Sequence, residues 1–388
     1  MTNNYNNSLE PIIKYPGGKE KELKYIIPSL PKTVDRYYEP FVGGGAVYFA
    51  MSANSYYIND KSDELISLYN MVKEQNHEFF NKLNAIEHNW SIVSDIVDHH
   101  KNQLINYYNR FVEDDLSVEK LGDLITSFVI KNSDEFNGLL NPDFNYEIES
   151  FFNELCKSIQ NKMKRMKKIS SEKGVLSEED KVANIEASFK AAFYTHFRRL
   201  MNYKDEFGIS EEFATAIYFF IRQTCYSSMF RYNRNGKFNV PYGGISYNRK
   251  SFSNKIKYYE NEELVDHLKN TTIGNMDFYS FMNKYKPRKN DFIFLDPPYD
   301  TEFSTYAKNE FDKNDQARLA DYLINETKGN FMIVIKNTEY ISSLYREGTP
   351  TANGGKLYVN SFEKKYFVSF QNRNNKEAEH LLITNYEI

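Results

Sequence analysis

The stretch 36-RYYEPFVGGGAVYFA-50 decides the fold of this 388-residue chain. Aromatic residues run into an acid and a proline, and three consecutive glycines, Gly43 to Gly45, precede a second apolar run. This order is typical of a buried parallel strand followed by a glycine loop that opens a helix. Because glycine has no side chain, the loop backbone can approach a ligand where other residues would collide.

Short apolar runs recur towards both ends of the chain and alternate with helical patterns. The runs are 55-SYYIND, 272-TIGNMDF, 291-DFIFLDPPY and 331-FMIVIKN, and the helical patterns include 61-KSDELISLYNMVKEQ and 312-DKNDQARLADYLINET. The last two runs, 356-KLYVNSFEKKYFVSF and 378-AEHLLITNY, are joined by a polar segment and predict a hairpin. This alternation predicts an α/β fold with a mostly parallel sheet that ends in an antiparallel hairpin.

The middle of the chain has a different pattern. From about residue 76 to 222 we find only amphipathic helical stretches, such as 183-ANIEASFKAAFYTHFRRLMN. The segment 231-RYNRNGKFNVPYGGISYNRK follows, and it predicts a hairpin whose exposed basic residues suit a DNA groove. We therefore expect a sheet domain formed by residues 1–75 and 265–388, with a large helical insertion at 76–264.

Composition narrows the class of protein without identifying it. The net charge of −4 does not indicate a nucleic-acid binder, although a basic face can be balanced by acids elsewhere. The run 161-NKMKRMKK is one such basic segment, either a solvated helix face or a phosphate-contacting patch. Cys156 and Cys225 alone cannot form a disulfide framework or a thiolate metal site. Signal-peptide and membrane-span patterns are missing from the sequence, so we expect a cytoplasmic protein.

A second feature indicates a nucleoside pocket. Asp60 ends a predicted strand 17 residues after Gly43, near the separation at which an acid reaches ribose hydroxyls in nucleoside-binding folds. The purely structural alternative for this aspartate is a helix N-cap. A dinucleotide site is disfavoured because Tyr48 occupies the last position of the G-x-G-x-x-G spacing, and 15-YPGGKEKE lacks the ending of a Walker A loop. A phosphate-free nucleoside such as S-adenosylmethionine fits better than NAD.

The tetrapeptide 296-DPPY-299 ends another predicted strand, at the sheet edge where α/β folds bind ligands. Pro297 and Pro298 fix the turn and remove two backbone donors, which leaves the Asp296 carboxylate and the Pro297 carbonyl as acceptors. These two groups can hold both hydrogens of an exocyclic amino group. Tyr299 offers a flat face for a base, and such stacking contributes about 1–3 kcal/mol. A strand-end turn without chemistry is the alternative for a bare Asp-Pro-Pro.

The chain resembles the Dam-type, or α-group, DNA adenine-N6 methyltransferases, because several of its segments match segments of that family and occur in the same order. The segments are 14-KYPGGK, 39-EPFVGGGAVYF with 58-IND, 231-RYNRNGKFNVPYG, 296-DPPY, 305-TYAKNEFDKNDQARLA and 376-KEAEHLLITNY. The resemblance covers roughly residues 12–75 and 215–388. It implies a Rossmann-like S-adenosylmethionine-dependent methyltransferase sheet as catalytic domain, an inserted target-recognition domain, and double-stranded DNA as substrate.

The resemblance also implies roles for individual residues. Cofactor-binding positions would be Tyr15, Lys19, Glu39, Pro40, Phe41, Gly43, Gly44, Gly45, Asp60, Asp277, Phe278 and Asp296. DNA-binding positions would be Lys14, Tyr226, Ser227, Arg231, Asn233, Arg234 and Pro241. The catalytic residues Asp296, Pro297, Pro298 and Tyr299 would grip an adenine flipped out of the duplex, whose amino nitrogen attacks the methyl group directly. Neither a metal nor a cysteine nucleophile is implied.

The recognition segment departs from relatives that read GATC, which usually run aromatic-Asn-Gly-Leu before the arginine. In 226-YSSMFRYN, Ser227 stands at the asparagine and Met229 at the leucine, and Gly244 replaces a further arginine. We therefore expect a site other than GATC, with additional readout or a partner surface in the helical region. Alternatives are cytosine-N4 methylation, release-factor glutamine methylation and a DNA-binding protein with a vestigial pocket; Asp296 favours adenine. The protein would act in a bacterial or phage setting, and three roles stay open: companion of a restriction endonuclease, orphan regulator of replication, and phage self-protection.

Overall fold

The computed structural model describes residues 8–299, 311–365 and 377–388. The start of the matching segment 305-TYAKNEFDKNDQARLA and most of the polar connection between the last two predicted strands lie outside the described residues. The chain folds into two compact units. The first comprises Met1–Glu74 and Asn261–Ile388, and the second comprises Gln75–Glu260.

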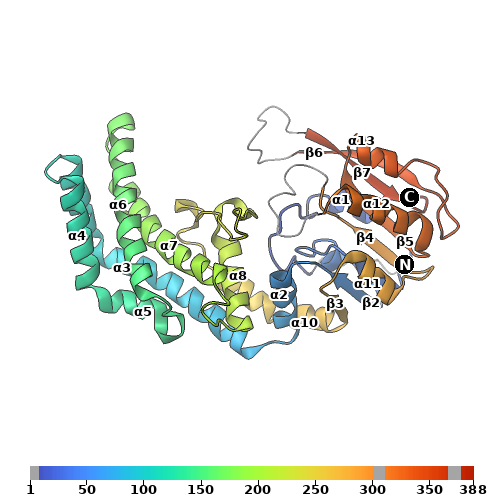
Figure 1. The fold of residues 1–388 in the computed structure, drawn as a ribbon, viewed down its shortest axis with the longest axis horizontal. Coiled ribbons are helices and arrows are strands. Elements are labelled where there is room, and N and C mark those ends of the chain that lie inside the picture. The colour runs from blue at the N-terminus through green and yellow to red at the C-terminus, as the bar shows by residue number, and fades with distance from the viewer. Residues whose placement is uncertain (1–7, 300–310, 366–376) are drawn as a thin grey trace. The chain divides into compact units, whose positions relative to one another are not determined.

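The first unit contains a seven-stranded sheet with the order β3-β2-β1-β4-β5-β7-β6 (Figure 1). Its strands are β1 (Arg36–Glu39), β2 (Ser55–Asn59), β3 (Thr271–Gly274), β4 (Phe292–Leu295), β5 (Asn330–Lys336), β6 (Tyr358–Lys365) and β7 (Glu377–Thr384). The pairs from β3 to β5 are parallel, whereas β7 runs antiparallel to β5 and β6 antiparallel to β7. The predicted α/β fold with a mostly parallel sheet and a C-terminal hairpin is confirmed.

Strand β4 is apolar throughout, and β5 is apolar between its end residues, because both faces of these strands are covered. All four side chains of β4 are buried, as are the five central side chains of β5. In the register, Tyr37 of β1 lies opposite Phe292 and Tyr38 opposite Ile293. The strand order reverses between β1 and β4. We call the position between these two strands, at the carboxyl end of the sheet, the crevice, because open α/β sheets bind ligands at such a reversal.

Short helices accompany the sheet in the first unit. They are α1 (Leu23–Ile26), α2 (Asp63–Lys73), α10 (Glu262–Lys269), α11 (Phe278–Tyr285), α12 (Lys313–Asp321) and α13 (Glu339–Leu344). The prediction of a helix after the glycine loop is wrong, because the chain forms only a single 3-10 turn there, at Tyr48–Ala50. The backbone is already extended at Met51 and must reach the start of β2 at Ser55, which leaves no length for a longer helix.

The second unit is built from helices, shown from cyan to yellow in Figure 1. They are α3 (His77–Val112), α4 (Val118–Lys131), α5 (Ser133–Phe144), α6 (Ile148–Lys173), α7 (Glu178–Asn202), α8 (Glu211–Thr224) and α9 (Ser253–Tyr259). Its core is aromatic: the Trp90 ring of α3 meets Phe220 of α8 edge-on, with 5.2 Å between ring centroids. Residues 76–222 contain no strand, as predicted.

Among the described residues, no helix combines the length and the apolar character needed to cross a membrane.

A short hairpin follows α8, as its sequence predicts. Tyr232 and Phe238 form an antiparallel bridge, and the turn between them is closed by Asn233, whose Oδ1 accepts from the backbone N–H of Lys237. Helix α7 supports the returning strand, because the Asn202 amide donates to the Phe238 carbonyl (2.9 Å) and accepts from the Phe238 N–H (2.7 Å). The hairpin is therefore attached to the helical core through its backbone, which leaves side chains at its tip exposed.

Candidate active site

The crevice between β1 and β4 brings together two of the predicted motifs. The glycine loop begins directly after Glu39 at the end of β1, and Asp296 follows Leu295 at the end of β4. In open α/β sheets, ligands bind at the point where the strand order reverses. The tertiary structure therefore makes neighbours of two segments that are more than 250 residues apart in the sequence.

The glycine loop is shaped by a close approach of the N-terminal segment. A Cβ atom on Gly44 would lie 2.4 Å from the carbonyl oxygen of Ile13, and the Gly44 carbonyl accepts a hydrogen bond from the Ile12 N–H (3.0 Å). Gly43 has a positive φ of 49°, and its added Cβ would meet the Tyr15 ring at 3.0 Å. Only glycine fits these positions, and the predicted cofactor residue Tyr15 lies directly against the loop.

Asp60 connects the glycine loop to the next helix. Its carboxylate accepts hydrogen bonds from the backbone N–H groups of Gly43 (3.1 Å) and Ser62 (2.9 Å). Burial raises the pKa of Asp60, and these backbone donors act in the opposite direction. The alternative role as N-cap of α2 is wrong, because Ser62 is the cap and accepts from the N–H of Leu65. Asp60, which follows the carboxyl end of β2, therefore does not cap α2.

Asn59 is a site residue that the sequence reasoning missed. Its side-chain amide donates to the carbonyls of Pro40 (3.1 Å) and Met276 (2.9 Å), and its oxygen accepts from the Met276 N–H (3.0 Å). One buried side chain therefore links the loops that follow β1 and β3. The signal was present in the sequence as an asparagine at the end of the strand 55-SYYIN, since a buried amide requires hydrogen-bond partners.

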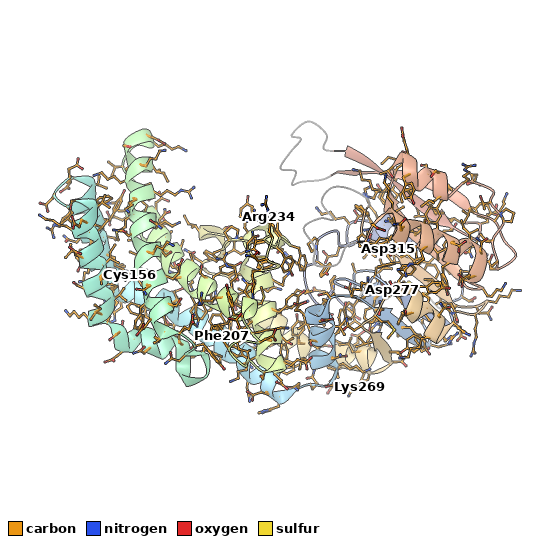
Figure 2. The ribbon with its side chains drawn as sticks, viewed as in Figure 1. Cys156, Phe207, Arg234, Lys269, Asp277 and Asp315 are labelled. Carbon is orange, nitrogen blue, oxygen red and sulfur yellow. The ribbon has the colours of Figure 1, made fainter. Side chains whose placement is uncertain are left out.

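The predicted residues Asp277 and Phe278 follow β3 and form the start of α11. Asp277 caps α11 by accepting from the Tyr279 N–H (3.0 Å), and its other oxygen pairs with Arg318 of α12 at 2.7 Å. Arg318 also pairs with Asp315, and Figure 2 labels both of these acids. The Arg318 guanidinium lies 4.7 Å from the centroid of the Phe278 ring. Arg318 was not singled out from the sequence, where it reads as an ordinary surface residue of an amphipathic helix.

A buried lysine pairs with the aspartate of the tetrapeptide. The Lys19 side chain is 2% exposed, and its ammonium forms an ion pair with the carboxylate of Asp296. The same nitrogen donates to the Gly17 carbonyl (3.1 Å) and to the Tyr299 hydroxyl (3.3 Å). Sequence reasoning placed Lys19 beside the cofactor; the structure joins it to two of the predicted catalytic residues.

A buried acid, Glu39, lies close to this ion pair. Glu39 accepts a hydrogen bond from the Tyr37 hydroxyl at 2.5 Å. Burial raises the pKa of Glu39 well above its ordinary value; the hydrogen bond from Tyr37 opposes this effect, and the negative charge of Asp296 adds to it. The two carboxyl groups therefore differ in environment, since Asp296 has a lysine partner and Glu39 has a neutral phenol.

The proline turn is held by residues from outside its own strand. Pro297 is buried and Pro298 is exposed, and the carbonyl of Pro298 accepts a hydrogen bond from Gln316 of α12 at 2.7 Å. The ring of Tyr299 meets His380 of β7 edge-on, with 5.6 Å between the ring centroids. Gln316 and His380 are fully buried, and neither was identified from the sequence. Together they limit the movement of the tetrapeptide.

Six of the seven predicted DNA-binding residues belong to the second unit, and Lys14 is exposed in the first. Arg231 is held by Asn239: its Nε donates to the side-chain oxygen (2.8 Å) and its Nη2 to the carbonyl (3.0 Å). Arg234 lies in the exposed tip of the hairpin (Figure 2). Of the six residues in the second unit, five are exposed: Tyr226, Ser227, Asn233, Arg234 and Pro241.

The basic run on α6 is partly engaged by other side chains. Lys167 pairs with Asp114 and Lys168 with Glu172, as expected for a solvated helix face.

In the described part of the chain, neither the cysteines nor clusters of metal-ligating side chains add to the site. Both cysteines are free. Across the ranges that the structure describes, no group of three or more histidine, cysteine, aspartate or glutamate side chains could hold a metal ion.

Comparisons with known proteins agree with this geometry. The family described as D12 class N6 adenine-specific DNA methyltransferase matches residues 15–121 and 121–360. Type II methyltransferase M.CviBI of Paramecium bursaria Chlorella virus NC1A is 36% identical over 172 residues, which are 44% of this chain and 60% of that enzyme. Type II methyltransferase M.MjaIII of Methanocaldococcus jannaschii is 23% identical over 354 residues, 87% of this chain and 88% of that enzyme.

A third relative is the Retron Ec67 DNA adenine methylase of Escherichia coli, 29% identical over 167 residues, which are 42% of this chain and 54% of that enzyme. The matches therefore span little more than half of the viral and retron enzymes and most of the archaeal one. The family match covers both motifs of the crevice and the hairpin. This chain belongs to the D12 class N6 adenine-specific DNA methyltransferases.

Proposed function

We propose that this protein transfers a methyl group from S-adenosylmethionine to the N6 amino group of an adenine flipped out of double-stranded DNA. The observation that carries the proposal is the position of Asp296, which follows β4 at the reversal of strand order and lies beside the glycine loop. Family membership supports the reaction. Residues 1–75 and 265–388 would be the catalytic domain, and 76–264 the helical insertion and target-recognition region.

The residues of the crevice suit a nucleoside without a phosphate. Asp60 presents a carboxylate at the end of β2, suited to ribose hydroxyls, and the partly buried ring of Phe41, which packs on Phe278 with 5.6 Å between the ring centroids, offers an apolar surface to a purine. Gly43 to Gly45 and Glu39 would lie along the methionine portion, with Tyr15 against the loop. S-adenosylmethionine supplies a methyl group on a positively charged sulfur.

The tetrapeptide would hold and orient the adenine. The Asp296 carboxylate and the Pro297 carbonyl each accept one hydrogen of the amino group, which directs the nitrogen lone pair away from the protein acceptors. Tyr299 stacks on the base, and its ring is already positioned by His380. Asp296 stabilises the positive charge that develops on nitrogen, and Lys19 fixes the orientation of this carboxylate.

The second unit would select the DNA sequence. Arg231 is proposed to read a guanine edge in the major groove, with Asn239 holding the guanidinium in one orientation. The replacements at Ser227, Met229 and Gly244 support a target other than GATC. The names of two relatives as type II methyltransferases support a restriction endonuclease companion acting at the same site. DNA as substrate supports the cytoplasm of a bacterium or of a phage-infected cell as the place of action.

Replacing Asp296 by alanine tests the catalytic assignment. We expect a loss of methyl transfer of at least about a hundredfold, because one of two acceptors of the amino group is removed. Much of the affinity for S-adenosylmethionine, measured by calorimetry, should be kept, because Asp60 and the glycine loop are unchanged. Asp266→Ala is the matched control, since this aspartate is exposed on α10 and its carboxylate forms an ion pair with Lys269 of the same helix. Near-normal turnover of Asp296→Ala would refute the assignment.

The methylated base distinguishes the proposal from its nearest alternative. DNA from a host that expresses the protein should contain N6-methyladenine, detected by mass spectrometry of nucleosides. N4-methylcytosine would contradict adenine as the target, and unmodified DNA after incubation with the active-site-intact protein would contradict DNA methylation altogether. Long-read methylome sequencing of the same host would also identify the recognition sequence.

A further inference from the structure

A buried arginine reaches the segment that connects α8 to the hairpin. Arg222, near the end of α8, is 1% exposed. Its Nη1 donates to the Met229 carbonyl at 2.8 Å, and its Nη2 donates to the Ser228 carbonyl at 2.7 Å. The centre of the guanidinium lies 3.7 Å from the centroid of the Phe230 ring. One side chain thus contacts three consecutive residues of the loop 226–230.

The backbone of this loop adopts a conformation that its residues rarely take. Ser227 has φ 52° and ψ 23°, and Ser228 has φ 50°. This left-handed region is unfavourable for residues with a Cβ atom; glycine enters it readily and asparagine more readily than most. Two consecutive serines therefore need support from the surrounding structure, and Arg222 binds the carbonyl of the second one.

The same loop is joined at its base to the hairpin. The Tyr226 N–H donates to the Pro241 carbonyl at 2.8 Å, and the Gly243 N–H donates to the Thr224 carbonyl at 2.9 Å. The two carbonyls held by Arg222 are turned to the buried side, whereas the Tyr226 side chain is 43% exposed and Ser227 is exposed. The buried side of the loop is thus fixed, and the other side is available to a ligand.

We propose that Arg222 is a positioning residue for DNA recognition, which stabilises the left-handed turn at Ser227 and Ser228 and thereby sets the orientation of Tyr226. The proposal rests on the proposed function of this segment as a DNA contact. Arginine is suited to the task because its planar guanidinium can donate to two neighbouring carbonyls while its face stacks on an aromatic ring. A lysine ammonium is a point charge and cannot do both.

The test compares Arg222→Met and Arg222→Lys, each alone and combined with Ser228→Gly. In Arg222→Met, hydrogen exchange of the amides of residues 226–230 should become at least about tenfold faster without DNA, because two charge-assisted hydrogen bonds are lost. With unmethylated plasmid DNA as substrate, KM for DNA should rise about tenfold while kcat changes by less than about threefold. Affinity for S-adenosylmethionine should not change.

Adding Ser228→Gly separates this role from a general contribution to folding. Glycine adopts the left-handed conformation at no steric cost, so the double variant should recover at least half of the loss in KM on a logarithmic scale. The control Arg346→Met, at an exposed position that follows α13, should behave as wild type. If Arg222→Met does not fold, Arg222→Lys provides the same comparison because it keeps the charge and removes the planar pair of donors.

Two results would overturn the proposal. The first is that the amides of residues 226–230 exchange at the wild-type rate in both Arg222→Met and Arg222→Lys. The second is that adding Ser228→Gly to an Arg222 variant changes neither the exchange rate of these amides nor KM for DNA. Failure of the proposed function is a separate outcome: if the wild-type protein methylates no DNA, the exchange measurements still decide whether Arg222 holds the turn.

Discussion

Replacing Gly44 by alanine tests whether the close approach of the N-terminal segment shapes the proposed cofactor site. The added Cβ would lie 2.4 Å from the Ile13 carbonyl oxygen and 3.2 Å from the Tyr15 Cβ. The nearer obstacle is a backbone atom, which cannot rotate aside as the end of a flexible side chain can. Either the segment that contains Ile13 and Tyr15 or the glycine loop must therefore move.

The magnitude follows from these contacts. A relaxed carbon–oxygen contact of roughly 3.4 Å requires a displacement of about 1 Å. Overpacking of this kind costs about 1–3 kcal/mol. The displacement also strains the hydrogen bond from the Ile12 N–H to the Gly44 carbonyl, which contributes about 0.5–1.5 kcal/mol. A total of about 2–4 kcal/mol, expressed in binding, weakens cofactor affinity roughly thirtyfold to a thousandfold.

Isothermal titration calorimetry with S-adenosylmethionine measures this loss of affinity. If the backbone relaxes in part, we still expect the affinity to fall by at least about tenfold. Gly138→Ala is the matched control. It makes the same chemical change within α5, where the added Cβ meets no atom within 4 Å, and it should stabilise that helix by up to about 1 kcal/mol. Wild-type affinity in Gly44→Ala would refute the idea that residues 12–15 form a wall of the pocket.

Two buried polar side chains give further tests. Asn59→Ala leaves groups on Pro40 and Met276 without their partner and should lower the free energy of unfolding by about 2–4 kcal/mol in urea titrations; an unchanged midpoint would show that Asn59 does not hold the loops together. Burial lowers the pKa of Lys190 to about 7. Between about pH 7 and about pH 10 the unfolded chain therefore binds one more proton than the folded chain. The free energy of unfolding should rise with pH in this range, by up to about 1.4 kcal/mol per pH unit. Lys190→Met should remove that slope from denaturation curves recorded at pH 7, 8 and 9, and an equal slope in both proteins would contradict the assignment.

Much of the sheet was predictable because a buried strand needs an uninterrupted apolar run. The runs at residues 36, 55, 272, 291 and 331 all became parallel strands, and the last two runs became the antiparallel pair β6 and β7. The helix expected after the glycine loop was wrong, since local glycine and apolar patterns do not reveal how soon the next strand must begin. That distance is set by the pairing of β2 with β1 and β3.

The sequence by itself determined which groups carry the proposed chemistry, because an acid followed by two prolines and an aromatic residue has few uses at a strand end. Only the tertiary structure decided which groups support them. Gln316 and His380 reach the tetrapeptide, and Arg222 reaches the recognition loop, through hydrogen bonds and ring contacts formed after folding. Such contacts join residues that are distant in the chain or lie on opposite sides of a turn. The periodicity of a sequence reports which side chains are buried, whereas the partners of a buried polar group depend on how the elements pack.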